Sequence, residues 1–326
     1  MKKKRRLLFL LLVLFVLGMM ISLCIGPAKT GLNDLWNFVF RGDASNSTIF
    51  QIRLSRAILA FLVGASLSLS GAILQGYFQN PMAGPFVVGV SSGASFGAVL
   101  SLQLGLTFSF LGLNVQSVFA FATGFVIVYL VYFLSQKKGV FKVETLLLTG
   151  IAAGAMASAL TSFLIFLKSD SYEQAVFWLL GSFHLADWKQ IFAILPYFLV
   201  CFVAAQWFAK DMNLLVLGDD TAQSLGCSVK KMRKIFLALS TILAASAVSV
   251  SGIIGFVGLI VPHWVRLLIG PDHRSLFFFS FFTGGVFLVF SDLLARSLLF
   301  STELPIGIIT AVIGAPFFIY LLNQRR

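Results

Sequence analysis

Long apolar runs alternate with short polar stretches along the whole chain. Each run is close to the ~20 residues that a helix needs to cross a bilayer. The runs are continuous rather than alternating, so they predict helices and not the strands of a membrane barrel. The pattern therefore predicts an all-α polytopic membrane protein with about ten transmembrane helices, at residues 7–26, 55–77, 86–106, 117–135, 144–167, 189–209, 233–251, 254–269, 276–298 and 304–322.

Two of these runs need comment. The eighth is short and is bracketed by Gly252, Pro262 and Gly270, so we expect it to be bent or broken. The first follows MKKKRR, as in a secretory signal, and Cys24 hints at a lipoprotein cleavage site. However, Leu23 is too bulky for the small residue that such a site needs before its cysteine. We therefore expect residues 7–26 to be retained as the first span.

Composition and charge agree with a membrane location. The mean hydropathy is +0.96 and the chain contains 36 Phe, more apolar surface than a soluble core of this length could hide. A net charge of +12 could suggest nucleic acid in a soluble protein, but here it indicates cytoplasmic loops and anionic lipid. Ten spans place both termini on one side, and taking that side as cytoplasmic gives it 17 Lys and Arg against 7 outside. This bias predicts a multi-pass protein of the cytoplasmic membrane with both termini inside.

One polar stretch, GDDTAQSLGCSVKKMRK (218–234), lies on the cytoplasmic side between spans six and seven. Asp219 or Asp220 is expected to begin a short helix, because an acidic side chain there accepts bonds from free amides and favours the dipole. Gly226 is expected to end this helix in a left-handed conformation. Leu225 is expected to be the apolar residue by which the helix contacts a partner protein. Cys227 is the cysteine placed outside the spans, so we expect it to be reachable from the cytoplasm. An ordinary solvated loop is the alternative.

The sequence lacks the residues that ATP binding, metal binding and ion coupling usually require. The chain contains no Gly-Lys pair and therefore no phosphate-binding loop. We therefore expect that it is not an enzyme and that another subunit binds any ATP that is used. The three cysteines have no metal-ligand spacing, so no metal site is expected. Ion-coupled transporters usually carry ionisable residues at mid-membrane depth, whereas Asp292, Arg296 and Glu303 lie near span ends. Asp292 and Arg296 are four apart and can meet on one helix face.

GVSSG (89–93) formally matches the motif of a serine hydrolase, and an intramembrane protease would pair Ser91 with a histidine. The surrounding glycines, serines and alanines favour close helix packing instead. Two further small-residue faces occur in spans five and ten, and they suit either packing, within or between subunits, or the lining of a translocation path. Their members are Gly150, Gly154, Ser158, Gly307, Ala311 and Ala315.

Several long motifs resemble those of one family, in the same order. They are RLSRAILAFLVGASLSLSGAILQGYFQNPMAGPFVVGVSSGASFG (53–97), GDDTAQSLG (218–226), SGIIGFVGLIVPHWVRLLIGPDHR (251–274), DLLAR (292–296) and ELPIGIITAVIGAPFFIYLL (303–322). The chain is similar in these to the FecCD/BtuC family, the membrane permeases of iron-siderophore, haem and cobalamin ABC importers. It departs from the family at Ser55, commonly Pro, and at Gly84, often Glu.

The resemblance implies a single permease domain over residues 1–326 with a BtuC-like fold. It implies a second permease subunit, either identical or a close paralogue, two ATP-binding-cassette ATPases below and a solute-binding protein above. No cofactor is expected on this chain; ATP and magnesium would bind the ATPases. Residues 210–232 would be the cytoplasmic coupling segment, with Asp219, Asp220, Leu225 and Gly226 at the ATPase. The expected cargo is a ferric siderophore or haem, with cobalamin as the alternative and an ion-coupled transporter further behind.

Three arginines lie toward the outer side in this topology. Arg53 and Arg56 are three apart on one helical face, and Arg296 ends DLLAR. The resemblance implies that arginines at these positions meet acidic residues of the binding protein, a pairing that suits guanidinium groups. The alternative is that they anchor the helices at the headgroup level.

Overall fold

The computed structural model describes residues 2–25, 34, 36, 47–110, 112–137, 140–141, 143–167, 172–298 and 303–324. Its helices are α1 (Lys2–Cys24), α3 (Ser47–Tyr77), α4 (Val90–Gln103), α5 (Val115–Ser135), α6 (Val143–Leu167), α7 (Tyr172–Leu180), α8 (Trp188–Trp207), α9 (Ala209–Leu215), α10 (Asp219–Ser224), α11 (Val229–Ser251), α12 (Val257–Ile269), α13 (His273–Ser297) and α14 (Ile306–Gln324). Two small antiparallel hairpins join β1 (Ser109–Phe110) to β2 (Leu113–Asn114) and β3 (Gln136–Lys137) to β4 (Val140–Phe141).

A helix lies at each of the ten expected spans, although α3 begins at Ser47, eight residues earlier than expected. Among the described residues, seven helices are long and apolar enough to cross a membrane, α12 and α14 are shorter apolar helices, and α4 has 14 residues. The short eighth span is confirmed: α12 has 13 residues, and Gly270 follows it with φ 92°. The third span, expected at 86–106, is helical only from Val90 to Gln103, because turns occupy the residues after Asn80.

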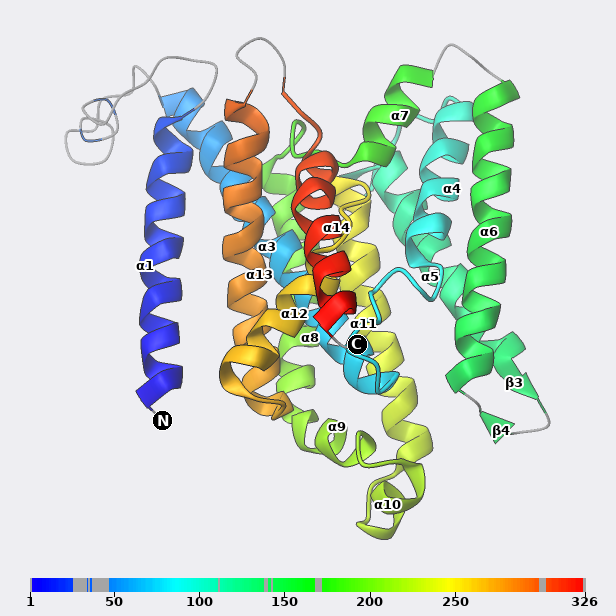
Figure 1. The fold of residues 1–326 in the computed structure, drawn as a ribbon. Coiled ribbons are helices and arrows are strands. Elements are labelled where there is room, and N and C mark those ends of the chain that lie inside the picture. The colour runs from blue at the N-terminus through cyan, green and yellow to red at the C-terminus, as the bar shows by residue number, and fades with distance from the viewer. Residues whose placement is uncertain are drawn as a thin grey trace.

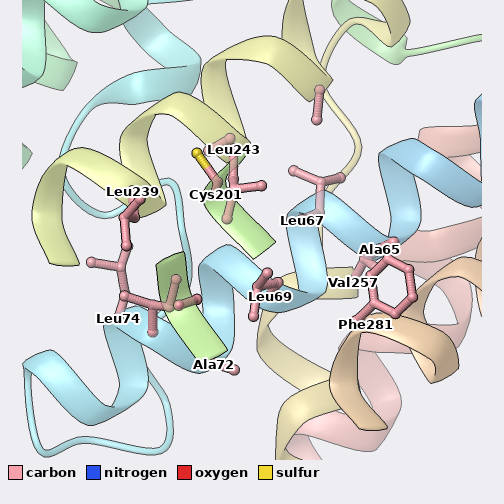
Figure 2. Close-up of a cluster of buried hydrophobic side chains, with 14 of the residues drawn as sticks. Ala65, Leu67, Leu69, Ala72, Leu74, Cys201, Leu239, Leu243, Val257 and Phe281 are labelled. Atoms are coloured by element: carbon pink, nitrogen blue, oxygen red, sulfur yellow. The ribbon is translucent and has the colours of Figure 1, made fainter. Parts of the chain in front are cut away.

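The long helix α3 runs through the centre of the bundle and packs against α8, α11, α12 and α13 (Figure 1). Figure 2 shows its side chains Leu67, Leu69 and Leu74 facing residues of α8, α11 and α12. Two glycines allow the closest approaches. A Cβ at Gly71 would lie 1.7 Å from the Gly258 carbonyl oxygen, and one at Gly64 would lie 2.2 Å from that of Gly284. The backbones of α3, α12 and α13 therefore meet directly, as small residues permit in membranes.

The bundle has two distinct ends (Figure 1). The N-terminus, α9, α10 and the β3–β4 hairpin lie at one, here the α10 end, and α7 lies at the other, here the α7 end. Lys137, Lys210, Lys230, Lys231 and Lys234 belong to elements at the α10 end, as the predicted topology grouped them. Of the other charges counted for that topology, some lie outside the described residues: Lys29, Arg41, Lys138, Lys142, Lys168, Arg325 and Arg326.

Candidate functional site

The polar segment at the α10 end forms the short helix that its sequence predicts. Helix α10 begins at Asp219 and ends at Ser224, and Gly226 adopts φ 87°. The expected cap by an aspartate is wrong: Gly218 is the N-cap, and no side chain accepts a bond from the free amides there. The amide of Gly226 donates to the Gln223 carbonyl (3.0 Å) and the amide of Cys227 to the Ala222 carbonyl (2.9 Å). These two bonds are the Schellman arrangement, which satisfies carbonyls at a helix end and requires the left-handed residue that glycine supplies. Leu225, just before this turn, is 58% exposed.

Arg233 holds α10 against the bundle, a role that the sequence did not reveal. Its Nε lies 3.2 Å from both carboxylate oxygens of Asp219, and its Nη1 donates to the Tyr77 carbonyl at 3.2 Å. Its guanidinium also lies over the Tyr77 ring, 5.2 Å from the centroid. Arg233 is buried, whereas the Asp219 side chain is 47% exposed. One arginine thus connects α10, the second turn of α11 and the last residue of α3.

Cys227 is not the accessible thiol that its place in the sequence suggested. It is 5% exposed and packs into the hydrophobic core. Burial raises the pKa of its thiol, and the charges of Asp211 and Asp219 raise it further. Only the thiolate attacks a reagent, so Cys227 is both shielded and kept protonated. The cause is the Schellman turn, which directs the chain after Gly226 back toward the bundle.

A second set of contacts fixes α9 beside the start of α13. Asn213 accepts from the amide of His273 and donates to the Asp272 carboxylate, both at 2.9 Å. Burial raises the pKa of the Asp272 carboxyl, but hydrogen bonds from Asn213 and Ser275 more than offset this, and the pKa lies below its ordinary value. Lys4 of α1 reaches Ser275 in the same region. Helix α9, which precedes α10, is therefore held against the start of α13.

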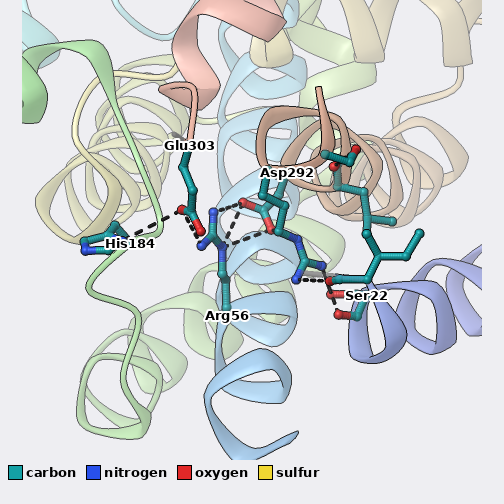
Figure 3. Close-up of polar contacts among 9 residues, drawn as sticks. Ser22, Arg56, His184, Asp292 and Glu303 are labelled. Atoms are coloured by element: carbon teal, nitrogen blue, oxygen red, sulfur yellow. Dashed lines mark hydrogen bonds and ion pairs between the residues drawn. The ribbon is translucent and has the colours of Figure 1, made fainter. Parts of the chain in front are cut away.

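At the α7 end, Arg56 lies at the centre of a cluster of charged residues (Figure 3). Its Nε and Nη2 donate to Asp292 at 2.9–3.2 Å, and its Nη1 donates to Glu303 at 2.7 Å. Arg296 approaches the same Asp292 at 3.5 Å, as its spacing of four residues predicts. His184 lies 3.8 Å from Glu303. We call these five residues the Arg56 cluster; it joins α3, α13 and the segment that leads into α14.

Arg53 and Arg296 both bind the end of α1. Arg53 Nη1 donates to the Leu23 carbonyl (2.7 Å), and Arg296 donates to the carbonyls of Ser22 (3.0 Å) and Ile25 (2.9 Å). The last carbonyls of a helix have no partners within it and carry partial negative charge, so two guanidiniums there satisfy and stabilise them. The expected open face of three arginines is therefore corrected: Arg53, Arg56 and Arg296 are all largely buried and paired within the chain.

A cavity of about 650 Å³ adjoins the Arg56 cluster. Its walls combine the charged residues Arg56, Asp292 and Glu303 with aromatic residues of α7 such as Phe177 and Trp178. Residues 304–306, at the start of α14, complete it. The cluster thus contacts a hollow between α7 and α14.

Three of the predicted small residues serve packing within this chain. A Cβ at Gly150 would lie 2.7 Å from the Val87 carbonyl, and one at Gly307 would lie 2.3 Å from that of Leu180. Gly154 lies against Gly89 and Ser92. Ser158 lies on the exposed side of α6 and contacts the Ser92 hydroxyl at 3.3 Å. Ala311 and Ala315 are half-buried on α14.

The GVSSG stretch also packs helices together. Gly93 of α4 lies against α5, where an added Cβ would be 2.9 Å from the Thr123 carbonyl, and Gly89 lies near Gly150 of α6. Ser91 is buried, and its carbonyl accepts the Ser95 hydroxyl. This is the close packing that the small residues predict.

Comparisons with known proteins agree with this arrangement. The model of the FecCD transport family matches residues 12–324. The cobalamin import permease BtuC of Halobacterium salinarum is 46% identical, with 87% of this chain and 75% of that protein covered. The iron(3+)-hydroxamate import permease FhuG of Bacillus subtilis is 39% identical over 96% of this chain and 95% of that one.

A solved structure gives the same result for the fold. It is a chain of a metal-chelate-type ABC transporter in an inward-facing conformation, with a TM-score of 0.86 and 36% sequence identity. The match covers 98% of this chain and 99% of that one. Two of the sites described above, α10 and the Arg56 cluster, fall inside the family match. The chain therefore belongs to the FecCD transport family and is the membrane permease of an ABC importer, not itself an enzyme.

Proposed function

We propose that this permease imports a bulky metal chelate across the cytoplasmic membrane, with cobalamin as the first candidate. The observation that carries the choice is the 46% identity to a cobalamin import permease. Between an iron complex and cobalamin, the comparisons reverse the order that the sequence motifs suggested. A ferric hydroxamate is the second candidate, because a permease for that cargo is 39% identical over nearly the whole chain.

We place the α10 end in the cytoplasm. The lysines of α9, α11 and β3 support this orientation, because positive charge is retained on the cytoplasmic side. Both termini would then be cytoplasmic. In the assembly we propose, two copies of this single-domain chain, or this chain and a close paralogue, enclose one path. Two ATPases that carry ATP and magnesium bind at the α10 ends, and a solute-binding protein docks at the α7 ends.

Residues 210–232 are the proposed coupling segment. Leu225 supports this, because an apolar side chain 58% exposed on a polar turn is suited to a pocket in a partner. The rigid mounting supports it as well, since Arg233 ties Asp219 to the end of α3. A push on α10 is therefore delivered to α11 and to the central helix of the bundle. Asp220, exposed in the first turn, and Gly226, which shapes the turn, complete the segment.

Docking at the α7 end is proposed to involve an exchange of carboxylates at Arg56. Of its two acidic partners, Asp292 is 2% exposed and Glu303 is 27% exposed. An acidic side chain of the binding protein would therefore displace Glu303 and leave Asp292 in place. Glu303 lies three residues before the first residue of α14, so its release would loosen the segment that leads into that helix. Arg53 and Arg296 would contribute by positive potential while they hold the end of α1.

We propose that the translocation path is lined by those small residues that do not make close backbone contacts within this chain. Ser158 on α6 and Ala311 and Ala315 on α14 are exposed or half-buried. A path of such side chains would bind its cargo weakly, so affinity would reside in the binding protein.

The test is uptake by cells that express this chain with its own ATPase and binding protein. Cobalamin and a ferric hydroxamate are supplied separately, each with a labelled metal. We expect ATP-dependent accumulation of cobalamin. Uptake of the ferric hydroxamate alone would select the second candidate, and uptake that continues without the ATPase would indicate an ion-coupled transporter instead.

A further inference from the structure

A groove lies between α5 and α11, in the half of the bundle nearer the α10 end. Its volume is about 330 Å³. The small residue Ala238, which is exposed on α11, and Tyr129 of α5 both line it. The side chains that form its walls include Phe125, Val128, Tyr129, Tyr132, Lys234 and Leu237.

Polar and apolar groups are separated along this groove. Lys234 lies in the second turn of α11 and Tyr132 in the last turn of α5, both near the α10 end. Phe125, Val128 and Leu237 lie deeper. The hydroxyl of Thr241 is already used, because it donates to the Leu237 carbonyl at 2.7 Å. One end of the groove therefore carries the ammonium of Lys234, and the rest offers aliphatic and aromatic surface.

This arrangement selects among the possible occupants. A single acyl chain is apolar along its length and therefore matches the walls formed by Phe125, Val128 and Leu237. Lys230 and Lys231 are exposed one turn nearer the end, so the groove opens below a row of three lysines. Such a row attracts anionic headgroups.

We propose that the groove binds an anionic phospholipid of the leaflet at the α10 end. One acyl chain lies along Phe125, Val128 and Leu237, and the phosphate lies at Lys234. This proposal rests on the proposed function only in placing the α10 end in the cytoplasm, and it holds whichever cargo is transported. Lys234 follows Arg233, so the lipid would contact α11 in the turn that mounts the coupling segment.

The test uses the full-length chain, purified in mild detergent and stripped of lipid. Thermal unfolding is followed while phosphatidylglycerol or phosphatidylcholine is titrated in, and retained lipid is identified by native mass spectrometry. We expect phosphatidylglycerol to bind and raise the unfolding midpoint. Lys234→Glu should weaken this binding by at least about fivefold, the equivalent of the ~1 kcal/mol that one basic residue contributes at an anionic surface. Ala238→Trp, at an exposed position, should fill the groove and abolish binding.

Lys210→Glu is the matched control, because it makes the same charge change on α9 at the same end but outside the groove. It should bind phosphatidylglycerol as the unchanged chain does. Equal binding of the two lipids, or unchanged binding by both groove variants, would overturn the proposal. Loss of binding in Lys210→Glu to the same degree would also overturn it, since general charge would then explain the effect.

Discussion

An arginine and a carboxylate form an ion pair at each end of this permease, but the two pairs differ in how far their carboxylates are exposed to solvent. At the α7 end, Asp292 is buried and Arg56 is nearly so, and Arg296 approaches the same carboxylate (Figure 3). At the α10 end, Arg233 is buried but Asp219 is 47% exposed, and Leu225 at the other end of the same helix is 58% exposed. The first pair joins helices inside the bundle, whereas the second mounts a small exposed helix on it.

The difference follows from the elements that the arginines join. Arg56 connects transmembrane helices whose relative placement α3 already fixes through glycine contacts. Arg233 connects α3 and α11 to a helix of six residues, which has no core of its own and depends on its attachments. We therefore expect damage at the α7 end to affect the stability of the chain, and damage at the α10 end to affect its coupling to a partner.

The largest effect is expected for Asp292→Ala. This change leaves the buried Arg56 with Glu303 alone and takes from Arg296 the carboxylate beside it. Breaking a buried pair by removing one partner typically costs ~3–5 kcal/mol. We expect a much lower thermal unfolding midpoint in detergent and poor recovery from membranes. Asp220→Ala, at an exposed carboxylate, should stay within about 0.5 kcal/mol of the unchanged chain. Equal unfolding midpoints for the two variants would contradict the view that the Arg56 cluster stabilises the folded chain.

Next in size is Leu225→Asp, which should prevent association with the ATPase and leave the chain folded. A charge placed in a closely packed interface without a partner costs several kcal/mol. The measurement is co-purification of the ATPase with the permease, together with the unfolding midpoint of the permease alone. Leu104→Asp is the control, because Leu104 is also 58% exposed but follows α4 toward the α7 end. If Leu104→Asp releases the ATPase and Leu225→Asp does not, the proposed orientation is wrong.

A smaller effect is expected for Arg233→Ala, and it concerns coupling. Asp219 can turn toward water once its partner is lost, so the stability cost should be near the ~1–3 kcal/mol of a charged hydrogen bond. The ATPase should still bind through Leu225, but transport per ATP hydrolysed should fall, because α10 is no longer tied to α3. Cys227 should also react faster with thiol reagents, since its burial depends on the same turn. If transport per ATP hydrolysed and the labelling rate of Cys227 both stay unchanged, Arg233 does not connect α10 mechanically to α3.

The sequence predicted these sites unequally, for physical reasons. Apolar length and small residues are local signals, so the spans, the end of α10 at Gly226 and the approach of Asp292 to Arg296 were all predicted. The partners of Arg56 are 236 and 247 positions away, and no local pattern records such a contact. Arg53 and Arg296 were read as outward-facing charges, because the sequence does not show that the carbonyls ending α1 would lie beside them. Arg233 was counted only as one more basic residue.

The smallest effect is expected at the exposed edge of the Arg56 cluster, with Glu303→Gln. If an acidic side chain of the binding protein displaces Glu303, the neutral amide should compete less well and docking should become tighter. A partly exposed ion pair contributes ~0.2–1 kcal/mol, so the gain should be at most about fivefold. It should be largest at low salt, where exposed charges are least screened. The measurement is the affinity of the purified binding protein for the permease in nanodiscs across a salt series. Glu173→Gln, a change of equal charge in the first turn of α7, is the control and should leave docking unchanged. Weaker docking in Glu303→Gln would mean that Glu303 supports the arrangement that the partner recognises, and the exchange of carboxylates would be wrong.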